Sequence, residues 1–123
     1  MVWYPSPNDI VEINRKVIQD FKVKKKDRHD VLSGGYSRLD KITEDLKTRR
    51  GNIKQKAGFL VSRLTKDHPF ASGNRRTAIW TGKTFFFRNT GIIVSSPPEK
   101  TEKLLKKIRY GTATEGDMGD YFR

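Results

Sequence analysis

Apolar residues recur every three or four positions along most of the chain, a pattern typical of amphipathic α-helices. The first stretch opens with Ser6 and Pro7, and Asp9 follows three residues after the serine, which predicts a helix that starts with a capping box. Its apolar side then continues at helical spacing through Ile10, Ile13, Val17 and Phe21.

Two further helices are predicted between a Gly-Gly break at residues 34–35 and the pair His68-Pro69. The second helix carries Leu39, Ile42 and Leu46 on one face, and the turn "TRRGNIKQ" follows it. The third runs from Ile53 to Asp67. Because a residue before proline is biased away from the helical conformation, this helix is expected to end there and to place His68 at its C-terminal end.

The segment from residue 74 to 90 is apolar on nearly every face, as expected of a helix surrounded by other helices. Phe85 to Phe87 alone would also suit a strand, but Gly91 predicts a helix stop. Ser96 as cap, Pro97 inside the helix and Glu99 three residues on predict another helix, and residues 114–123 add a short final one. The expected fold is all-α, with five or six helices around a central buried helix in one domain, residues 1–123.

The amino-acid composition indicates which class of partner the protein attracts, and it does not change the predicted fold. The chain has 26 Lys and Arg against 14 Asp and Glu, a net charge of +12, which attracts polyanions such as nucleic acids, nucleotides or acidic proteins. The basic run "KVKKKDRHD", with Lys24 to Lys26 and His29, is expected to be a solvated loop. With no cysteine, no secretory leader and no membrane-length apolar stretch, we expect a cytoplasmic protein without membrane contact.

The segment "HPFASGNRRTA" carries the candidate chemistry, because it combines a histidine with a polar, basic helix start. A helix N-terminus attracts phosphate through its unpaired N–H groups. Gly73 lets the backbone approach a ligand closely, and Asn74 can hydrogen-bond that ligand. Arg75 and Arg76 can neutralise the charge of the ligand. His68 could take a proton from an attacking hydroxyl. Considered one at a time, His68 could equally be a structural histidine and Asn74 a residue that only caps the helix.

This segment resembles the Fic/Doc motif, in which His-Pro-Phe is followed by one variable residue, an acidic residue, Gly-Asn, then Gly or Lys, then Arg. The run "NRRTA" is similar to the Doc (death on curing) branch, and "SPNDIVEIN", "FLVSRLTKD" and "FFFRNTG" also look like Doc. The resemblance implies a transferase of phosphorus-containing groups that moves part of ATP to a hydroxyl of a target protein.

Carried over by the resemblance, His68 is the general base, and Pro69 and Phe70 support the motif, with Phe70 anchoring the loop in the core. Gly73 and Asn74 form the phosphate nest, Arg75 joins the binding site, and Arg76 pairs with phosphate. The Doc-like pattern further implies a toxin controlled by a separate antitoxin protein, because "SSPPEK" departs from the family's self-inhibitory helix.

Two positions depart from the family pattern. Ser72 stands where the acidic magnesium ligand belongs, and a hydroxyl is a poorer ligand for Mg²⁺ than a carboxylate, so weak metal binding is expected. Arg75 replaces the Fic glycine and resembles the Doc lysine, which favours a pose with the γ-phosphorus of ATP at His68 and therefore phosphorylation. Ile79 stands where adenylylating members carry a second arginine.

Three alternatives stay open beside a Doc-like kinase that modifies a Ser, Thr or Tyr hydroxyl. One is protein adenylylation, since the same base can serve either transfer. A second is a non-catalytic Fic-fold protein that binds a nucleotide or a partner, which Ser72 suggests. A third is a basic nucleic-acid-binding module, suggested by the net charge but less expected, because the basic runs lack interleaved aromatic residues.

Overall fold

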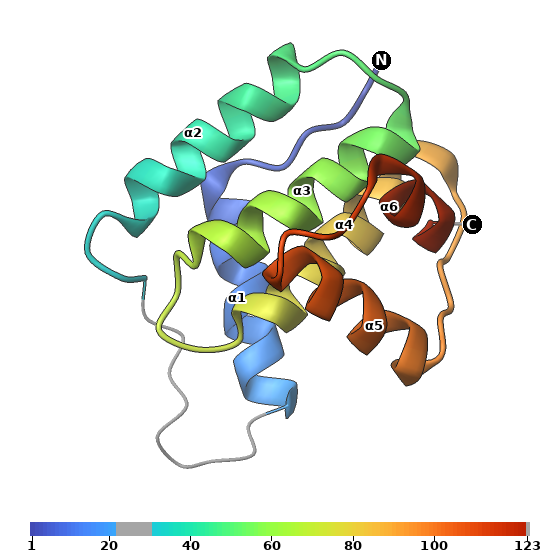
Figure 1. Cartoon of the computed structure of the whole chain (residues 1–123). Helices are drawn as coiled ribbons and strands as arrows, with labels where there is room; N and C mark the ends of the chain where they lie inside the picture. The colour runs from blue at the N-terminus through green and yellow to red at the C-terminus, as the bar shows by residue number, and fades with distance from the viewer. Residues whose placement is uncertain (22–30, 123) are drawn as a thin grey trace.

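A computed structural model describes residues 1–21 and 31–122 of the chain (Figure 1). The loop expected at residues 22–30, with His29 and Lys24 to Lys26, lies outside the described residues. Those residues contain no strand, only an isolated antiparallel bridge between Val31 and Phe70. The helices are α1 (Pro7–Phe21), α2 (Gly35–Thr48), α3 (Ile53–Asp67), α4 (Asn74–Thr90), α5 (Pro98–Arg109) and α6 (Glu115–Tyr121). The all-α prediction with five or six helices is confirmed.

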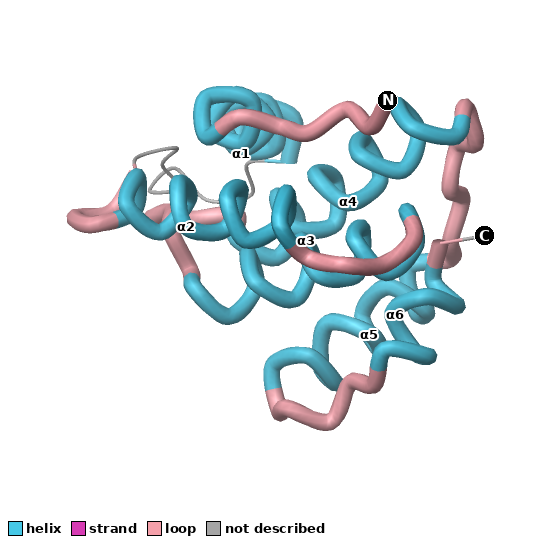
Figure 2. Tube along the Cα trace, turned by 90° about the horizontal axis from the view of Figure 1, so that it is seen from above, coloured by secondary structure: helices cyan, strands magenta, loops and turns pink. Residues whose placement is uncertain are grey.

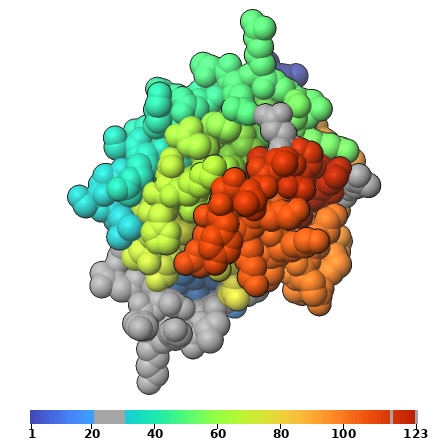
Figure 3. Space-filling view, in the orientation of Figure 1, coloured from blue at the N-terminus to red at the C-terminus, as the bar shows by residue number. Residues whose placement is uncertain are grey.

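Helices α3 and α4 form the centre of the bundle. Helix α1 lies on one side of this pair, and α5 and α6 lie on the opposite side (Figure 2). Helix α2 packs against α3 and α1. On the face shown in Figure 3, α2, α3 and the C-terminal helices make up the surface and cover most of α4. No helix in the described part of the chain is both long and apolar enough to cross a bilayer.

The central pair packs closely because α4 carries a glycine at the contact. A β-carbon on Gly82 would lie 2.6 Å from Val61 Cγ2 and 2.9 Å from Phe122 Cζ. Real β-carbons do not approach neighbours that closely, so no larger residue fits at position 82 without displacing α3 or the C-terminal segment. One hydrophobic core draws residues from all six helices.

Helix α1 starts as predicted, and its predicted inner face is confirmed at Ile10 and Val17 but not at Ile13. Ser6 and Asp9 form the expected capping box, with Ser6 N–H donating to Asp9 Oδ2 at 2.8 Å and Asp9 N–H donating to Ser6 Oγ at 3.1 Å. The buried positions of α1 are Ile10, Asn14, Val17 and Ile18, whereas the predicted Ile13 is only half-buried. A polar residue therefore faces the core.

The cap predicted at the start of α5 is wrong. Pro97 is the N-cap residue, and no side chain caps this helix end. The Pro97 carbonyl accepts hydrogen bonds from Lys100 N–H at 3.0 Å and Thr101 N–H at 3.3 Å. The second proline, Pro98, takes the first helical position, where its fixed φ fits, and this shift leaves Ser96 one residue too early to cap the helix.

Helix α4 is not enclosed on every side, contrary to the prediction. Trp80 and Phe87 are 43% and 47% exposed, although the helix ends at Gly91 as predicted. The two aromatic residues lie seven positions apart and so share one face. Helices α1 and α3 pack against α4, but the side chains of Trp80 and Phe87 stay partly exposed.

The start of the chain is tied to the end of α4. Trp3 N–H donates to Asn89 Oδ1 at 2.8 Å, and Asn89 Nδ2 donates back to the Trp3 carbonyl at 3.1 Å. The Arg88 guanidinium also stacks over the Trp3 ring at 4.6 Å from its centroid. These contacts join segments 86 residues apart in sequence.

Candidate active site

The end of α3 presents His68 to solvent. His68 is the C-cap residue, with φ 51° and ψ 59°, and its N–H donates to the Leu64 carbonyl at 3.4 Å. It is the only residue other than glycine with positive φ in the described ranges. Such a conformation strains an L-residue and is found often at functional sites. The imidazole is exposed and borders an open hollow together with Leu32, Arg38 and Asp67.

The loop after His68 is fixed by Asn74, the first residue of α4. Asn74 Oδ1 accepts a hydrogen bond from Phe70 N–H at 3.0 Å, and Asn74 Nδ2 donates to the Phe70 carbonyl at 2.8 Å. Asn74 is 6% exposed and Phe70 is fully buried. The Asn74 amide therefore braces the loop, and its predicted hydrogen bond to a ligand stays a prediction.

A second brace comes from the segment before α2. Leu32 N–H donates to the Pro69 carbonyl at 2.9 Å, next to the bridge between Val31 and Phe70. Gly35 allows this approach, because a β-carbon there would lie 2.5 Å from both the Pro69 oxygen and Val31 Cγ1. The His68 loop is thus held by backbone on the α2 side.

A third brace comes from α1 through Asn14, which sequence reasoning missed. Its Nδ2 atom donates to the Ser72 carbonyl at 2.9 Å and to Thr77 Oγ1 at 3.0 Å, and the residue is fully buried. Its Oδ1 atom has no hydrogen-bond partner among the described residues. The signal was present in the sequence, since Asn14 lies four residues after Ile10 and three before Val17, on the face that the helix buries.

Gly73 joins this loop to α4 and lies against α1. It is the N-cap residue with φ 75° and ψ 18°, a conformation that favours glycine. A β-carbon on Gly73 would lie 2.9 Å from Ile18 Cδ1 and 3.5 Å from Val17 Cγ1. The need for glycine at this position therefore comes from its backbone angle and the close contact with α1.

The first turn of α4 carries the charge of the candidate site. Thr77 N–H donates to the Gly73 carbonyl at 2.9 Å, and the peptide N–H groups of Asn74 and Arg75 precede this first hydrogen bond of the helix. Arg75 and Arg76 belong to this turn, and both side chains are exposed. Peptide N–H groups, the positive end of the helix dipole and two guanidinium groups make the start of α4 suitable for an anion, and we call this region the phosphate cradle.

An ion-pair network holds the end of α3 next to His68. Arg63 Nη1 donates to Asp45 Oδ2 at 2.8 Å, and Arg63 Nε donates to Asp67 Oδ2 at 3.2 Å. The hydrogen bond from Arg63 holds the pKa of Asp45 below its ordinary value. The network links α2 to the last residue of α3 and so orients the residue before His68.

The loop offers little to a magnesium ion. Ser72 is half-buried, and its carbonyl oxygen is already an acceptor for Asn14. No group of three or more His, Asp or Glu side chains that could hold a metal ion occurs in residues 1–21 and 31–122. These donors do not fit Mg²⁺, which prefers carboxylate oxygens, and we derive no chemical step through it.

The candidate site residues of the motif come together in one region. His68 ends α3, Pro69 and Phe70 lie in the braced loop, and the chain from Ser72 to Arg76 leads into α4. A histidine at a helix end, followed by a braced loop and a basic helix start, places a candidate general base beside a candidate anion site.

The comparison with protein families identifies the family of this chain. The family model described as Fic/DOC family matches residues 4–86, a range that holds α1, α2, α3 and most of α4. The chain belongs to the Fic/DOC family, which at family level means a Fic-type transferase fold. No curated protein matches the chain.

Proposed function

We propose that this protein is a Doc-like kinase that transfers the γ-phosphoryl group of ATP to a Ser, Thr or Tyr hydroxyl of a target protein, and that it is the toxin of a toxin–antitoxin pair. The observation that carries the proposal is the exposed His68 at the end of α3, held by three braces in a loop that leads to the phosphate cradle. A base and an anion site on one rigid loop are what in-line phosphoryl transfer needs.

In the proposed reaction, the His68 imidazole takes the proton of the target hydroxyl as its oxygen attacks the γ-phosphorus. The new oxygen–phosphorus bond forms as the bond from the γ-phosphorus to the bridging oxygen breaks, and ADP leaves. The proton then passes from the imidazole to solvent. Arg75, Arg76 and the N–H groups of the first turn of α4 neutralise the phosphate charge throughout.

Arg75 supports phosphoryl rather than adenylyl transfer. A guanidinium at the first turn adds charge and bulk where a glycine would leave the nest open, so the γ-phosphate end of ATP is expected at the loop. Adenylylation would place the α-phosphorus there instead. The two reactions differ in which end of the same nucleotide reaches His68.

The experiment compares ATP labelled at the γ-phosphate with ATP labelled at the α-phosphate, incubated with the protein and a cell lysate that supplies target proteins. We expect label in protein from the γ position only, and loss of that label in His68→Asn, since asparagine tolerates the left-handed conformation at position 68. His68-dependent label from the α position only would contradict the proposal and indicate adenylylation.

Ser72 favours a second function, a Fic-fold protein that binds nucleotide or a partner without catalysis. The observation behind it is the poor set of magnesium donors at the loop. Label from neither position, together with ATP binding that Arg76→Ala weakens, would support this second function. Nanomolar binding to duplex DNA that is unchanged in Arg76→Ala would support a nucleic-acid-binding module instead.

A further inference from the structure

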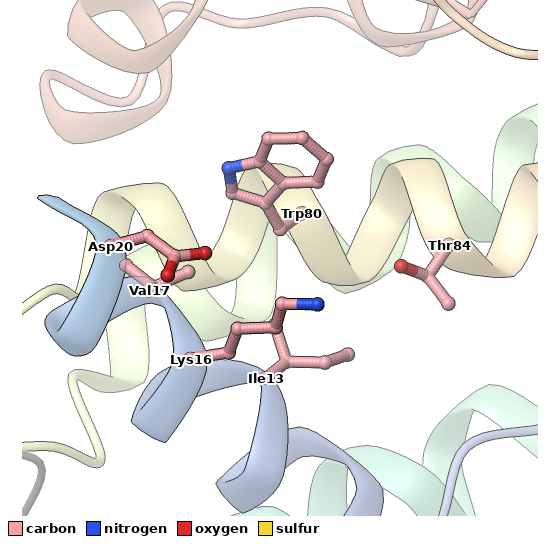
Figure 4. A pocket seen from close by; sticks show the side chains of 6 residues that line it. All are labelled: Ile13, Lys16, Val17, Asp20, Trp80 and Thr84. Atoms are coloured by element: carbon pink, nitrogen blue, oxygen red, sulfur yellow. The ribbon is translucent and has the colours of Figure 1, made fainter.

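A pocket between α1 and α4 is the strongest feature that the proposed reaction leaves unexplained. It has a volume of about 500 Å³ and lies under the exposed ring of Trp80 (Figure 4). Pockets of this size hold small organic molecules. We call it the α1–α4 pocket, and its lining residues are Ile13, Lys16, Val17, Asp20, Trp80 and Thr84.

The α1–α4 pocket begins where the phosphate cradle ends. Val17 lines the pocket, and its Cγ1 atom also lies 3.5 Å from the point that a β-carbon on Gly73 would occupy. On α4, Arg76 precedes Trp80 by four residues, so the two side chains share one face. Trp80 follows Asn74 by six positions, about 9 Å along the helix axis, which is within the reach of one nucleoside triphosphate.

Trp80 gives the pocket a flat aromatic wall. The indole ring is 43% exposed and stands above the pocket opposite Ile13, Val17 and Lys16 on α1, with the Lys16 nitrogen directed into the pocket (Figure 4). An exposed indole facing two aliphatic side chains suits a planar ring system, which stacks on the indole and makes apolar contacts with α1.

Asp20 gives one end of the pocket an acceptor for hydroxyl groups, and its negative charge offsets the positive charge of Lys16 in the same lining. Its carboxylate lies between Val17 and Trp80, at the end of the pocket shown in Figure 4. No hydrogen bond or ion pair engages this carboxylate within the part of the chain that the structure describes. A carboxylate repels phosphate oxygens and accepts hydrogen bonds from hydroxyl or amino groups.

We propose that the α1–α4 pocket binds the nucleoside part of ATP, with the base stacked on Trp80 and the Asp20 carboxylate accepting hydrogen bonds from ribose hydroxyl groups. The proposal rests on the proposed function, since it takes the phosphate chain to lie at the first turn of α4. A nucleotide placed this way directs its phosphates out of the pocket toward the loop. The γ-phosphate is then the end that reaches His68.

The test measures binding of three probes by calorimetry: ATP, ATP lacking both ribose hydroxyls, and inorganic tripolyphosphate. Base–aromatic stacking predicts that Trp80→Ala weakens ATP binding by about 5- to 100-fold and leaves tripolyphosphate binding unchanged. Phe87→Ala is the matched control, because Phe87 is 47% exposed on the same helix and does not line the pocket. It is expected to bind both probes like the wild type. Asp20→Ala is expected to abolish the preference for ATP over the analogue without ribose hydroxyls.

Arg76→Ala separates this inference from the proposed function. It is expected to weaken ATP and tripolyphosphate binding alike, because it belongs to the phosphate cradle. Wild-type ATP affinity in Trp80→Ala, with a loss in Arg76→Ala, would overturn the nucleoside pocket and leave the phosphate cradle standing. An equal loss of affinity for ATP and for tripolyphosphate in Trp80→Ala would also overturn the nucleoside pocket. No ATP binding by the wild type, or binding unaffected by Arg76→Ala, would refute the cradle and the pocket together.

Discussion

Replacing Asn74 with alanine removes the amide that braces the loop between His68 and α4. The change deletes two hydrogen bonds, one from Phe70 N–H and one to the Phe70 carbonyl. Phe70 is fully buried and Asn74 is 6% exposed, so water does not freely replace the lost partner. The Phe70 backbone groups are then left unpaired in the interior.

The expected loss follows from those two bonds. Each contributes about 1 kcal/mol net, and an unpaired buried group costs about 1 to 3 kcal/mol, so we expect Asn74→Ala to lower the free energy of unfolding by about 2 to 4 kcal/mol. For a chain of 123 residues this corresponds to a fall in Tm of about 8 to 15 °C.

Urea denaturation followed by far-UV circular dichroism measures the change, with Arg75→Ala as the control. Arg75 is the exposed neighbour, and its substitution is expected to shift stability by less than about 0.5 kcal/mol. A loss below about 1 kcal/mol in Asn74→Ala, combined with loss of ATP binding as large as that in Arg76→Ala, would refute the bracing role and assign the amide to the ligand.

Three further predictions concern packing, pH and metal. Gly82→Ala is expected to destabilise the protein by about 1 to 3 kcal/mol in urea unfolding, because its β-carbon meets Val61 Cγ2, whereas Gly119→Ala in α6 has open space and should not destabilise. The pKa of Asp45 is lowered in the folded state, so the ionised carboxylate stabilises the fold at neutral pH, and this stabilisation is lost as pH falls below about 4. In acid unfolding, the free energies of unfolding of Asp45→Asn and of the wild type should therefore become equal below that pH. Ser72→Asp is expected to tighten magnesium-dependent ATP binding in titrations with and without Mg²⁺, and strong magnesium dependence already in the wild type would contradict the argument.

Much of the fold could be predicted because the residues that start and stop most of the helices lie next to the helix ends in the sequence. The ends of α3 and α4 follow from residues next to them in sequence, the Pro69 that stops one helix and the Gly91 that stops the other. The start of α5 could not be placed correctly, because Ser96 and Pro98 both carry local start signals and the backbone around the second proline decides between them.

The candidate site could be located from the sequence but its supports could not. His68, Gly73 and Arg76 stand in one short segment, so their proximity follows from the chain itself. The braces come from Asn14 and the segment at Leu32, and nothing local to either predicts contact with a loop far along the chain. The exposed face of Trp80 was missed for a similar reason, since an apolar residue does not reveal which helix fails to cover it.

The contacts that α1 and the N-terminal segment make with the loop and α4 can form only late in the synthesis of these segments. A ribosome delivers the chain from its N-terminus, so α1 emerges long before the helix that completes its contacts. The hydrogen bonds of Asn14 cannot form until Ser72 and Thr77 have been synthesised, and those of Trp3 cannot form until the last turn of α4 has been synthesised. A nascent chain that has not yet released α4 therefore carries His68 without the brace that Asn74 provides. The loop of the candidate site can therefore take its final geometry only after α4 has left the ribosome.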